Sequence, residues 1–303
     1  MSDMRVNLCG VELKNPVITA SGTFGYGMEY NEFYPVGRLG GIACKGTALH
    51  EWKGNPSPRI AETPAGMLNS VGLQNPGVDM FLSTYLPWLK SQGATVIANA
   101  AGHSVEEYCA VVERLSDSDV DLIELNISCP NVREGGVNFG TSCESVAHVT
   151  AEVRKHCSKP LMVKLTPNVT NIGDIAAAAA DAGADALSLI NTLTGMRIDI
   201  RTRRPILRNN TGGLSGSAVF PIAVRMVREV YKRVKVPVVG MGGISSWEDA
   251  AEMMLAGAAA VQVGTANFRD PFAAMKILEG LEAFAAAEGL SSVTELTGGV
   301  TEW

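Results

Sequence analysis

Residues 236–265 read VPVVGMGGISSWEDAAEMMLAGAAAVQVGT and hold a complete strand–helix–strand unit. The apolar run Val236–Gly240 leads into a glycine pair, and Ser246 then precedes two acidic residues, a pattern typical of a helix N-terminus. Gly257 follows the alanine-rich helix as a C-terminal cap, and the next apolar run is Ala260–Val263. Neither run alternates cleanly between apolar and polar residues, which indicates parallel strands buried on both faces.

The same unit recurs along the chain. Eight short apolar runs are predicted to be strands: Val17–Ala20, Gly41–Lys45, Thr95–Ala98, Leu122–Asn126, Leu161–Lys164, Ala186–Ile190, Val236–Gly240 and Ala260–Val263. Helical patterns accompany them at Asn75–Ser91, Ser104–Leu115, Ser142–His156, Ile172–Ala182, Ala218–Arg233, Ser246–Ala256 and Pro271–Ala287. This alternation predicts an α/β fold of the (β/α)8 TIM-barrel type, with an open doubly wound sheet as the alternative.

The bulk composition fits one soluble domain. The chain has 303 residues, of which 46% are hydrophobic, and no repeat, linker or charge block divides it. We therefore predict a single domain over 1–303, with 46–75 and 191–217 as long functional loops. The net charge of −6 gives no general attraction to nucleic acid or to an anionic membrane, so we expect neither as a partner.

The cellular setting follows from the cysteines and the apolar runs. Six cysteines without a CxxC pair indicate free thiols in a reducing compartment rather than a disulfide framework. We find no signal-peptide pattern at the N-terminus and no unbroken apolar run of about 18 residues. A cytoplasmic protein without a membrane span is the expectation.

Every predicted strand ends in a hydrogen-bonding side chain or in bare glycine backbone. These ends carry Ser21, Lys45, Asn99, Asn126, Lys164, Asn191, Thr192, Gly242, Gly243, Gly264 and Thr265. One asparagine at a strand end is commonly structural, but the carboxyl ends of barrel strands meet at one rim, where active sites lie. Together they predict a site at this rim. The glycines after the last two strands suit a phosphate, although tight turns would also explain them.

The chemistry of this rim is partly open. Lys45 and Lys164 have apolar neighbours that are expected to be buried, so each ammonium group needs either an ion-pair partner or a function. The possible functions are a Schiff base, binding of a substrate carboxylate, or a positive charge near a cofactor ring. The chain has four histidines, none of them at a strand end, and no residues at metal-ligand spacing, so we predict no metal site. Cys129, in NISCPNVREGG (126–136), is either a buried filler or the missing base.

Ten strings carry a family resemblance: TASGTFGYG, CKGTAL, GNPSPR, MLNSVGLQNPG, NISCPN, VKLTPN, NTLTG, GGLSG, GMGGI and VGTA. They closely resemble the motifs of class 1 dihydroorotate dehydrogenases, stand in the family's order and lie between residues 15 and 268. The resemblance implies a (β/α)8 barrel that binds FMN at its C-terminal rim. It also implies oxidation of (S)-dihydroorotate to orotate in pyrimidine (UMP) biosynthesis.

The resemblance also implies roles for individual positions. Those that match flavin ligands are Ser21, Lys45, Gly46, Asn99, Asn126, Lys164, Ile190, Gly216, Gly242, Gly243, Gly264 and Thr265. Those that match the dihydroorotate pocket are Lys45, Asn69, Ser70, Val71, Gly72, Leu73, Asn126, Asn191 and Thr192. Cys129 matches the catalytic base, and the glycine-rich stretch Val132–Gly140 is the candidate lid.

The cysteine base and the motif details resemble the NAD-linked type 1B enzymes. The membrane-bound class uses serine and carries an N-terminal extension. Type 1B implies a partner subunit carrying FAD and a 2Fe–2S cluster, in a heterotetramer of two of each chain around a homodimer core. The alternatives are a fumarate-linked type 1A enzyme, a dihydropyrimidine dehydrogenase-like flavoenzyme and, from another class, a non-catalytic binding or scaffold barrel.

Overall fold

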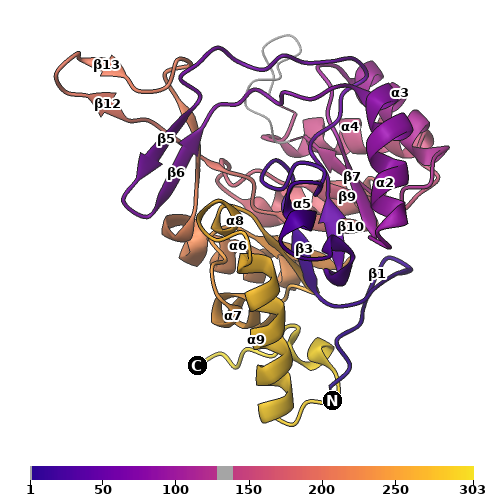
Figure 1. Cartoon of the computed structure of the whole chain (residues 1–303). Coiled ribbons are helices and arrows are strands. Elements are labelled where there is room, and N and C mark those ends of the chain that lie inside the picture. The colour runs from indigo at the N-terminus through magenta and orange to yellow at the C-terminus, as the bar shows by residue number, and fades with distance from the viewer. Residues whose placement is uncertain (1, 128–138) are drawn as a thin grey trace.

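The computed structural model describes residues 2–127 and 139–303. Its centre is a closed barrel of parallel strands in the order β10-β15-β16-β3-β4-β7-β8-β9 (Figure 1). These are β3 (Val17–Thr19), β4 (Gly41–Ala43), β7 (Val96–Ala100), β8 (Leu122–Asn126), β9 (Leu161–Lys164), β10 (Ala186–Leu189), β15 (Val238–Met241) and β16 (Ala260–Val263). The TIM-barrel prediction is confirmed, and the open sheet is wrong because β10 pairs with both β9 and β15.

The predicted strands and the observed strands agree closely. Leu122–Asn126, Leu161–Lys164 and Ala260–Val263 are strands over those same residues. The seventh strand begins two residues later than predicted, at Val238, because Pro237 has no N–H to donate to a neighbouring strand. Short strands that are buried throughout therefore show clearly in the apolar runs of the sequence.

Helices surround the barrel (Figure 1). They are α1 (Val78–Met80), the π-helix η3 (Phe81–Tyr85), α2 (Leu86–Ser91), α3 (Val105–Ser116), α4 (Cys143–Lys155), α5 (Ile172–Asp181), α6 (Phe220–Arg233), α7 (Trp247–Ala256), α8 (Ala266–Arg269) and α9 (Ala273–Ala287). Short 3-10 turns are η1 (Tyr30–Glu32), η2 (Val36–Arg38), η4 (Ser217–Val219) and η5 (Val293–Leu296). Ser246 and Asp249 form a capping box at the start of α7, as the sequence pattern indicates.

The helix predicted over Asn75–Ser91 begins later, at Val78. The Asn75 side chain instead accepts hydrogen bonds from the backbone N–H groups of Ala48 and Gly77. A side chain that bonds nearby backbone in this way competes with helix formation, which explains the later start. Asn75 thereby anchors the loop after β4, and its Nδ2 atom also donates a 2.7 Å hydrogen bond to the Leu73 carbonyl.

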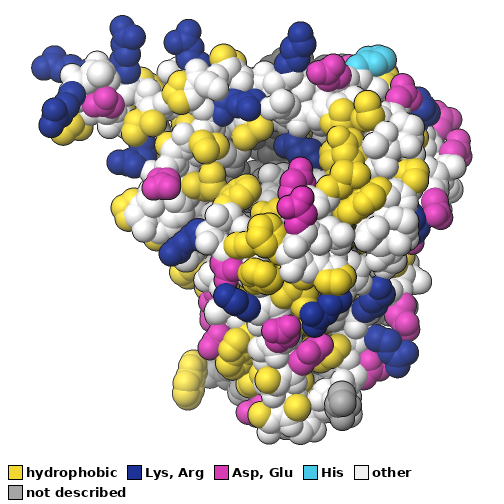
Figure 2. All heavy atoms as spheres, in the orientation of Figure 1, with side chains coloured by type: hydrophobic (Ala, Val, Ile, Leu, Met, Phe, Trp, Pro, Cys, Tyr) yellow, Lys and Arg dark blue, Asp and Glu magenta, His cyan; other side chains and the backbone are white. Residues whose placement is uncertain are grey.

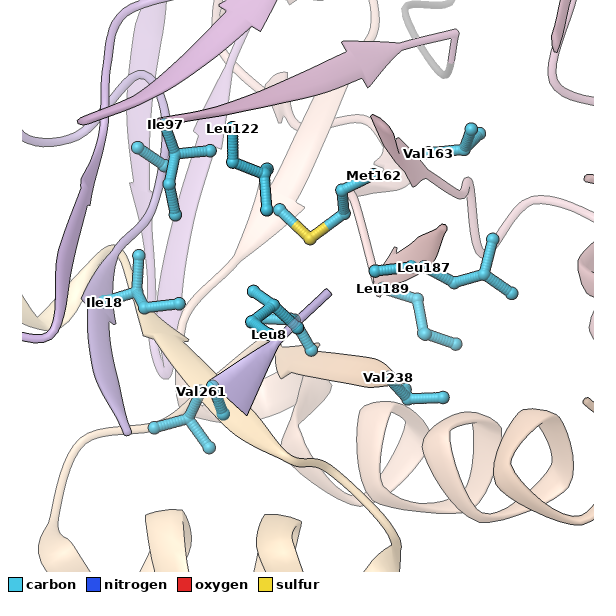
Figure 3. Close-up of a cluster of buried hydrophobic side chains, with 14 of the residues drawn as sticks. Leu8, Ile18, Ile97, Leu122, Met162, Val163, Leu187, Leu189, Val238 and Val261 are labelled. Carbon is cyan, nitrogen blue, oxygen red and sulfur yellow. The ribbon is translucent and has the colours of Figure 1, made fainter. Parts of the chain in front are cut away.

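The amino-terminal hairpin of β1 (Val6–Leu8) and β2 (Val11–Leu13) contributes to the core. Figure 3 shows Leu8 of this hairpin among side chains from several barrel strands, including Ile18 of β3 and Val261 of β16. Leu8 is fully buried, and several side chains drawn around it, among them Leu122, Met162 and Val261, come from the first halves of their strands. The hairpin therefore packs at the amino-terminal end of the barrel, and the carboxyl-terminal rim is at the opposite end.

The two predicted excursions, 46–75 and 191–217, form one sheet of order β11-β14-β6-β5. Its strands are β5 (Ile60–Thr63), β6 (Gly66–Asn69), β11 (Leu193–Gly195) and β14 (Gly212–Ser215), and a small hairpin of β12 (Ile198–Asp199) and β13 (Arg204–Pro205) extends from it. Figure 1 shows this hairpin as an arm away from the barrel, and Figure 2 shows lysine and arginine side chains gathered at its tip. The excursions are therefore ordered structure that adjoins the rim.

In the part of the chain that the structure describes, no helix is both long enough and apolar enough to cross a bilayer. The cysteines there, Cys9, Cys44, Cys109, Cys143 and Cys157, are all free thiols. For these five residues, the prediction of free thiols rather than a disulfide framework is confirmed.

Candidate active site

Lys164 is a buried cation at the carboxyl-terminal end of β9, beside Asn126 of β8 in the strand register. The residue is 5% exposed. Across residues 2–127 and 139–303, no ion pair or hydrogen bond of its ammonium is found. Because burying a cation without a partner is costly, this position suits an anionic or electron-rich group supplied by a ligand. Lys164 thus meets the requirement for a residue that stabilises charge on a cofactor ring.

Four predicted flavin residues pack together at the start of α6. A β-carbon on Gly243 would lie 2.7 Å from Phe220 Cβ and 2.9 Å from the Gly216 carbonyl oxygen. One on Gly242 would lie 2.9 Å from Ile190 Cγ1. Gly216, Gly242 and Gly243 all have positive φ angles, so both space and backbone conformation require glycine there.

The backbone amides of these turns are available to an anion. Among the described residues, the N–H groups of Gly242, Gly243, Gly264 and Thr265 donate no hydrogen bond. Successive open N–H groups form a concave nest that favours a phosphate. The glycines thus make tight turns and also present donors, so the two explanations of their role are compatible and the phosphate end of FMN fits.

Ser21 lies close to the turn that carries Gly264 and Thr265. Ala20, the residue before Ser21, donates a 2.8 Å backbone hydrogen bond to Val263, the residue before Gly264. The Thr265 hydroxyl donates a 2.8 Å hydrogen bond to Ser215 Oγ, next to Gly216. The turns after β3, β14 and β16 are therefore joined at one end of the rim.

Lys45, Gly46 and Asn99 form the middle of the rim. A β-carbon on Gly46 would lie 3.0 Å from Asn99 Oδ1 and 3.4 Å from Leu73 Cδ2, and one on Gly22 would lie 4.0 Å from Lys45 Nζ. Gly46 therefore brings a predicted flavin ligand close to the predicted substrate segment 69–73. The side-chain oxygen of Asn99 is buried and has no hydrogen-bond partner in the described residues. A buried acceptor without a partner is a feature of a site that a ligand completes.

The predicted substrate residues meet on the excursion sheet and the end of β8. Asn69 of β6 lies opposite Gly213 of β14, and its amide nitrogen donates to the Gly213 carbonyl at 3.4 Å. Thr192 packs directly against Gly213, since a β-carbon there would lie 2.0 Å from Thr192 Oγ1. Asn191 Nδ2 donates to Asn126 Oδ1 at 3.4 Å. The sheet therefore brings 69–73 toward the end of β8.

Hydrogen bonds to its backbone hold the segment 69–73 in place, and one of its polar side chains has no partner in the described residues. Asn55 Nδ2 donates a 2.9 Å hydrogen bond to the Ser70 carbonyl, and the Val71 carbonyl accepts one from the Asn55 backbone N–H at the same distance. Gly72 and Leu73 both have positive φ angles. The Ser70 hydroxyl is buried without a partner in the described residues. These features fit a segment that holds its backbone open to a small polar substrate.

The predicted base, Cys129, lies outside the described residues, and so does most of the predicted lid, Val132–Gly140. The described chain leads to this segment from Asn126, whose carbonyl accepts a 2.8 Å hydrogen bond from the Tyr108 hydroxyl. The part of the rim that the structure describes holds every other predicted site residue.

Sequence reasoning missed one group of residues inside the barrel, namely Glu124, Ser188 and Gln262. All three are buried, and hydrogen bonds connect the Glu124 carboxylate to the other two and to Asn99. The signal was present in the sequence as single polar residues within apolar strands, LIELN, ALSL and AVQV. Their contacts with one another depend on barrel closure, which a local pattern does not reveal.

The chain is similar to known proteins over nearly its whole length. The family model described as dihydroorotate dehydrogenase matches residues 3–285. A protein of Alkaliphilus metalliredigens is 56% identical over 98% of this chain and 98% of its own length. Relatives from Petrotoga mobilis and Bacteroides thetaiotaomicron are 53% and 52% identical, each over 98% of this chain and 99% of their own length. All three are named dihydroorotate dehydrogenase B (NAD(+)), catalytic subunit. By the extent of these matches, this chain belongs to the dihydroorotate dehydrogenase family.

Proposed function

We propose that this chain is the FMN-binding catalytic subunit of an NAD-linked dihydroorotate dehydrogenase, which oxidises (S)-dihydroorotate to orotate in the pyrimidine (UMP) pathway. The observation that carries the proposal is the rim itself. There the ammonium of the largely buried Lys164, which has no partner among the described residues, and the open amides of Gly242 and Gly243 favour an anionic, phosphate-bearing ligand. Family membership supports a flavin as that ligand.

The residues of the rim divide the work of flavin binding and oxidation. Bound FMN supplies the acceptor for the hydride that leaves C6 of dihydroorotate. The Lys164 ammonium stabilises negative charge on the ring, and the nest at Gly242 and Gly243 holds the phosphate. Cys129 is the proposed base for the C5 proton, which is weakly acidic and needs a positioned acceptor.

The substrate is a small pyrimidine ring that carries a carboxylate. Asn69, Asn126 and Asn191 offer paired donors and acceptors to the ring amides. Lys45, together with the open segment 69–73, binds the carboxylate. This set of groups favours dihydroorotate over dihydrouracil, because only dihydroorotate has the carboxylate.

The partner belongs to the same proposal. The relatives' name, catalytic subunit, implies a second subunit that completes the enzyme. We propose that this partner carries FAD and a 2Fe–2S cluster, passes electrons to NAD in the cytoplasm, and binds a homodimer of this chain in a complex of two of each.

Stopped-flow spectroscopy of the FMN-loaded protein tests the activity. Dihydroorotate is expected to bleach the flavin absorbance, while dihydrouracil at the same concentration leaves it oxidised. Bleaching by dihydrouracil would indicate a dihydropyrimidine dehydrogenase-like enzyme. A colourless protein that takes up no FMN would support the non-catalytic barrel.

The electron acceptor needs a separate assay with and without the co-expressed partner subunit. Turnover with NAD is expected only when the partner is present, and turnover with fumarate is expected to be absent in both preparations. Rapid turnover with fumarate by this chain alone would identify the type 1A enzyme instead.

A further inference from the structure

A carboxylate lies inside the barrel below the rim. Glu124 of β8 is fully buried, and its Oε2 atom accepts a 2.6 Å hydrogen bond from Asn99 Nδ2 on the neighbouring strand β7. Its Oε1 atom accepts hydrogen bonds from Ser188 Oγ of β10 and Gln262 Nε2 of β16, each 2.8 Å long. The two carboxylate oxygens therefore have different partners, and Oε2 is the one that binds Asn99.

This contact sets the orientation of the Asn99 amide. The hydrogen bond runs from Asn99 Nδ2 to Glu124 Oε2, so Asn99 directs its NH2 group at the Glu124 carboxyl group. The amide oxygen then faces the other way, and a β-carbon on Gly46 would lie 3.0 Å from it. Within the described residues, this buried oxygen has no partner. A buried acceptor without a partner therefore lies beside Gly46, in the middle of the rim where the flavin is proposed to bind.

We propose that Glu124 is a positioning residue that fixes the Asn99 amide, so that Asn99 offers the flavin an acceptor rather than a donor. The inference rests on the proposed function, since it assumes that FMN binds at this rim. Removing the carboxylate frees the amide to turn, and a turned amide presents N–H groups where the site requires an oxygen. An N–H of the flavin ring then loses its acceptor, which weakens binding.

The test compares a variant that removes all three hydrogen bonds of the Glu124 carboxylate with one that removes a single bond to Oε1. Glu124→Leu removes the acceptor of Asn99. Ser188→Ala is the matched control, because it removes one donor to Oε1 and leaves the bond between Oε2 and Asn99 in place. FMN is titrated into flavin-stripped protein, with flavin fluorescence as the readout and thermal melting as the check on folding.

We expect Glu124→Leu to raise the Kd for FMN by about 10- to 100-fold. Ser188→Ala is expected to keep the Kd within about threefold of the wild type. Equal weakening by the two variants, or wild-type affinity in Glu124→Leu, would overturn the proposal. If the wild type itself takes up no FMN, or is not reduced by dihydroorotate, the proposed function fails instead.

A conservative variant adds a rescue. Glu124→Gln keeps an oxygen that can accept from Asn99, and the Gln262 oxygen, which has no partner in the described residues, can turn to accept from the new amide. Binding close to that of the wild type is expected for Glu124→Gln. If Glu124→Gln lost FMN affinity as severely as Glu124→Leu, this would contradict the proposal that an acceptor at position 124 orients the Asn99 amide.

If Glu124→Leu does not fold, the test uses a double variant in which the carboxylate and the amide exchange positions between residues 99 and 124. Asn99→Asp alone places a second buried carboxylate next to that of Glu124, and this variant is expected to bind FMN weakly. Adding Glu124→Gln restores a donor between positions 99 and 124 while an oxygen still faces the flavin, so the double variant is expected to regain binding. A double variant that binds FMN no better than Asn99→Asp overturns the proposal.

Discussion

At the scale of single residues, Lys164 is expected to lower the stability of the flavin-free protein and to strengthen the binding of FMN. The residue is largely buried and its ammonium lacks a partner in the described residues, so the flavin-free protein bears part of the desolvation of a cation. Lys164→Met removes the charge and keeps most of the apolar stem. We expect the free energy of unfolding of the flavin-free protein to rise by about 1–3 kcal/mol.

The same variant is expected to bind FMN more weakly, because the ligand loses the cation. Urea unfolding of the flavin-free protein and FMN titration measure the two effects separately. A variant that is less stable without flavin, or that binds FMN as the wild type does, would contradict the role given to Lys164.

Cys129 can be tested by removing its thiol alone. Cys129→Ala is expected to keep FMN but to slow flavin reduction by dihydroorotate about 10²- to 10⁴-fold, because a positioned base contributes that much. Stopped-flow bleaching of the loaded protein measures the rate. Cys143→Ala, which removes an exposed thiol at the start of α4, is the control and is expected to react at the wild-type rate. Wild-type speed in Cys129→Ala would exclude the cysteine as the base.

At the scale of elements, the turn after β15 makes a specific prediction about glycine. A β-carbon on Gly243 would meet Phe220 at the start of α6 and would lie on backbone with φ of +83°. Gly243→Ala is therefore expected to displace the turn and lower FMN affinity at least about tenfold, as measured by titration.

Gly10 provides the matched control for that variant. Its φ is +87°, but a β-carbon there meets nothing within 4 Å, since Gly10 lies in the turn between β1 and β2. Gly10→Ala is expected to cost about 1 kcal/mol of stability through backbone strain and to leave FMN affinity unchanged. Equal effects of the two variants on FMN would show that the position of Gly243 has no special importance.

At the scale of the whole molecule, buried thiols make stability depend on alkaline pH. Burial, with the nearby Asp185 carboxylate, raises the pKa of Cys9 from 9.0 to about 11. Burial also raises the pKa of Cys44 and Cys157. A raised pKa in the folded state means that the stabilisation is fully present below pH 9 and is lost as the pH rises through the folded pKa.

We therefore expect the free energy of unfolding to fall between pH 9.0 and about 11 in urea titrations under reducing conditions. Cys9→Ser should make this decline shallower, because serine does not ionise there and can still donate to the Asp185 carbonyl that Cys9 contacts. The same slope in both proteins would show that Cys9 does not contribute.

The amino-acid sequence by itself determined the barrel and most of the rim. Apolar runs, helix caps such as Ser246 and strand-end residues such as Lys164 are local patterns, and local periodicity is enough to identify them. Family resemblance then linked those positions to FMN and dihydroorotate.

Only the tertiary structure decided which remote segments meet. The pairing of Asn69 with Gly213 joins two excursions, and the bond of Glu124 to Gln262 connects strands far apart along the chain. Such contacts depend on barrel closure, which sets the distance between strands independently of their separation in sequence. A polar residue in an apolar strand shows in the sequence, but its partner is set by the fold, because a buried carboxylate needs donors that other strands supply.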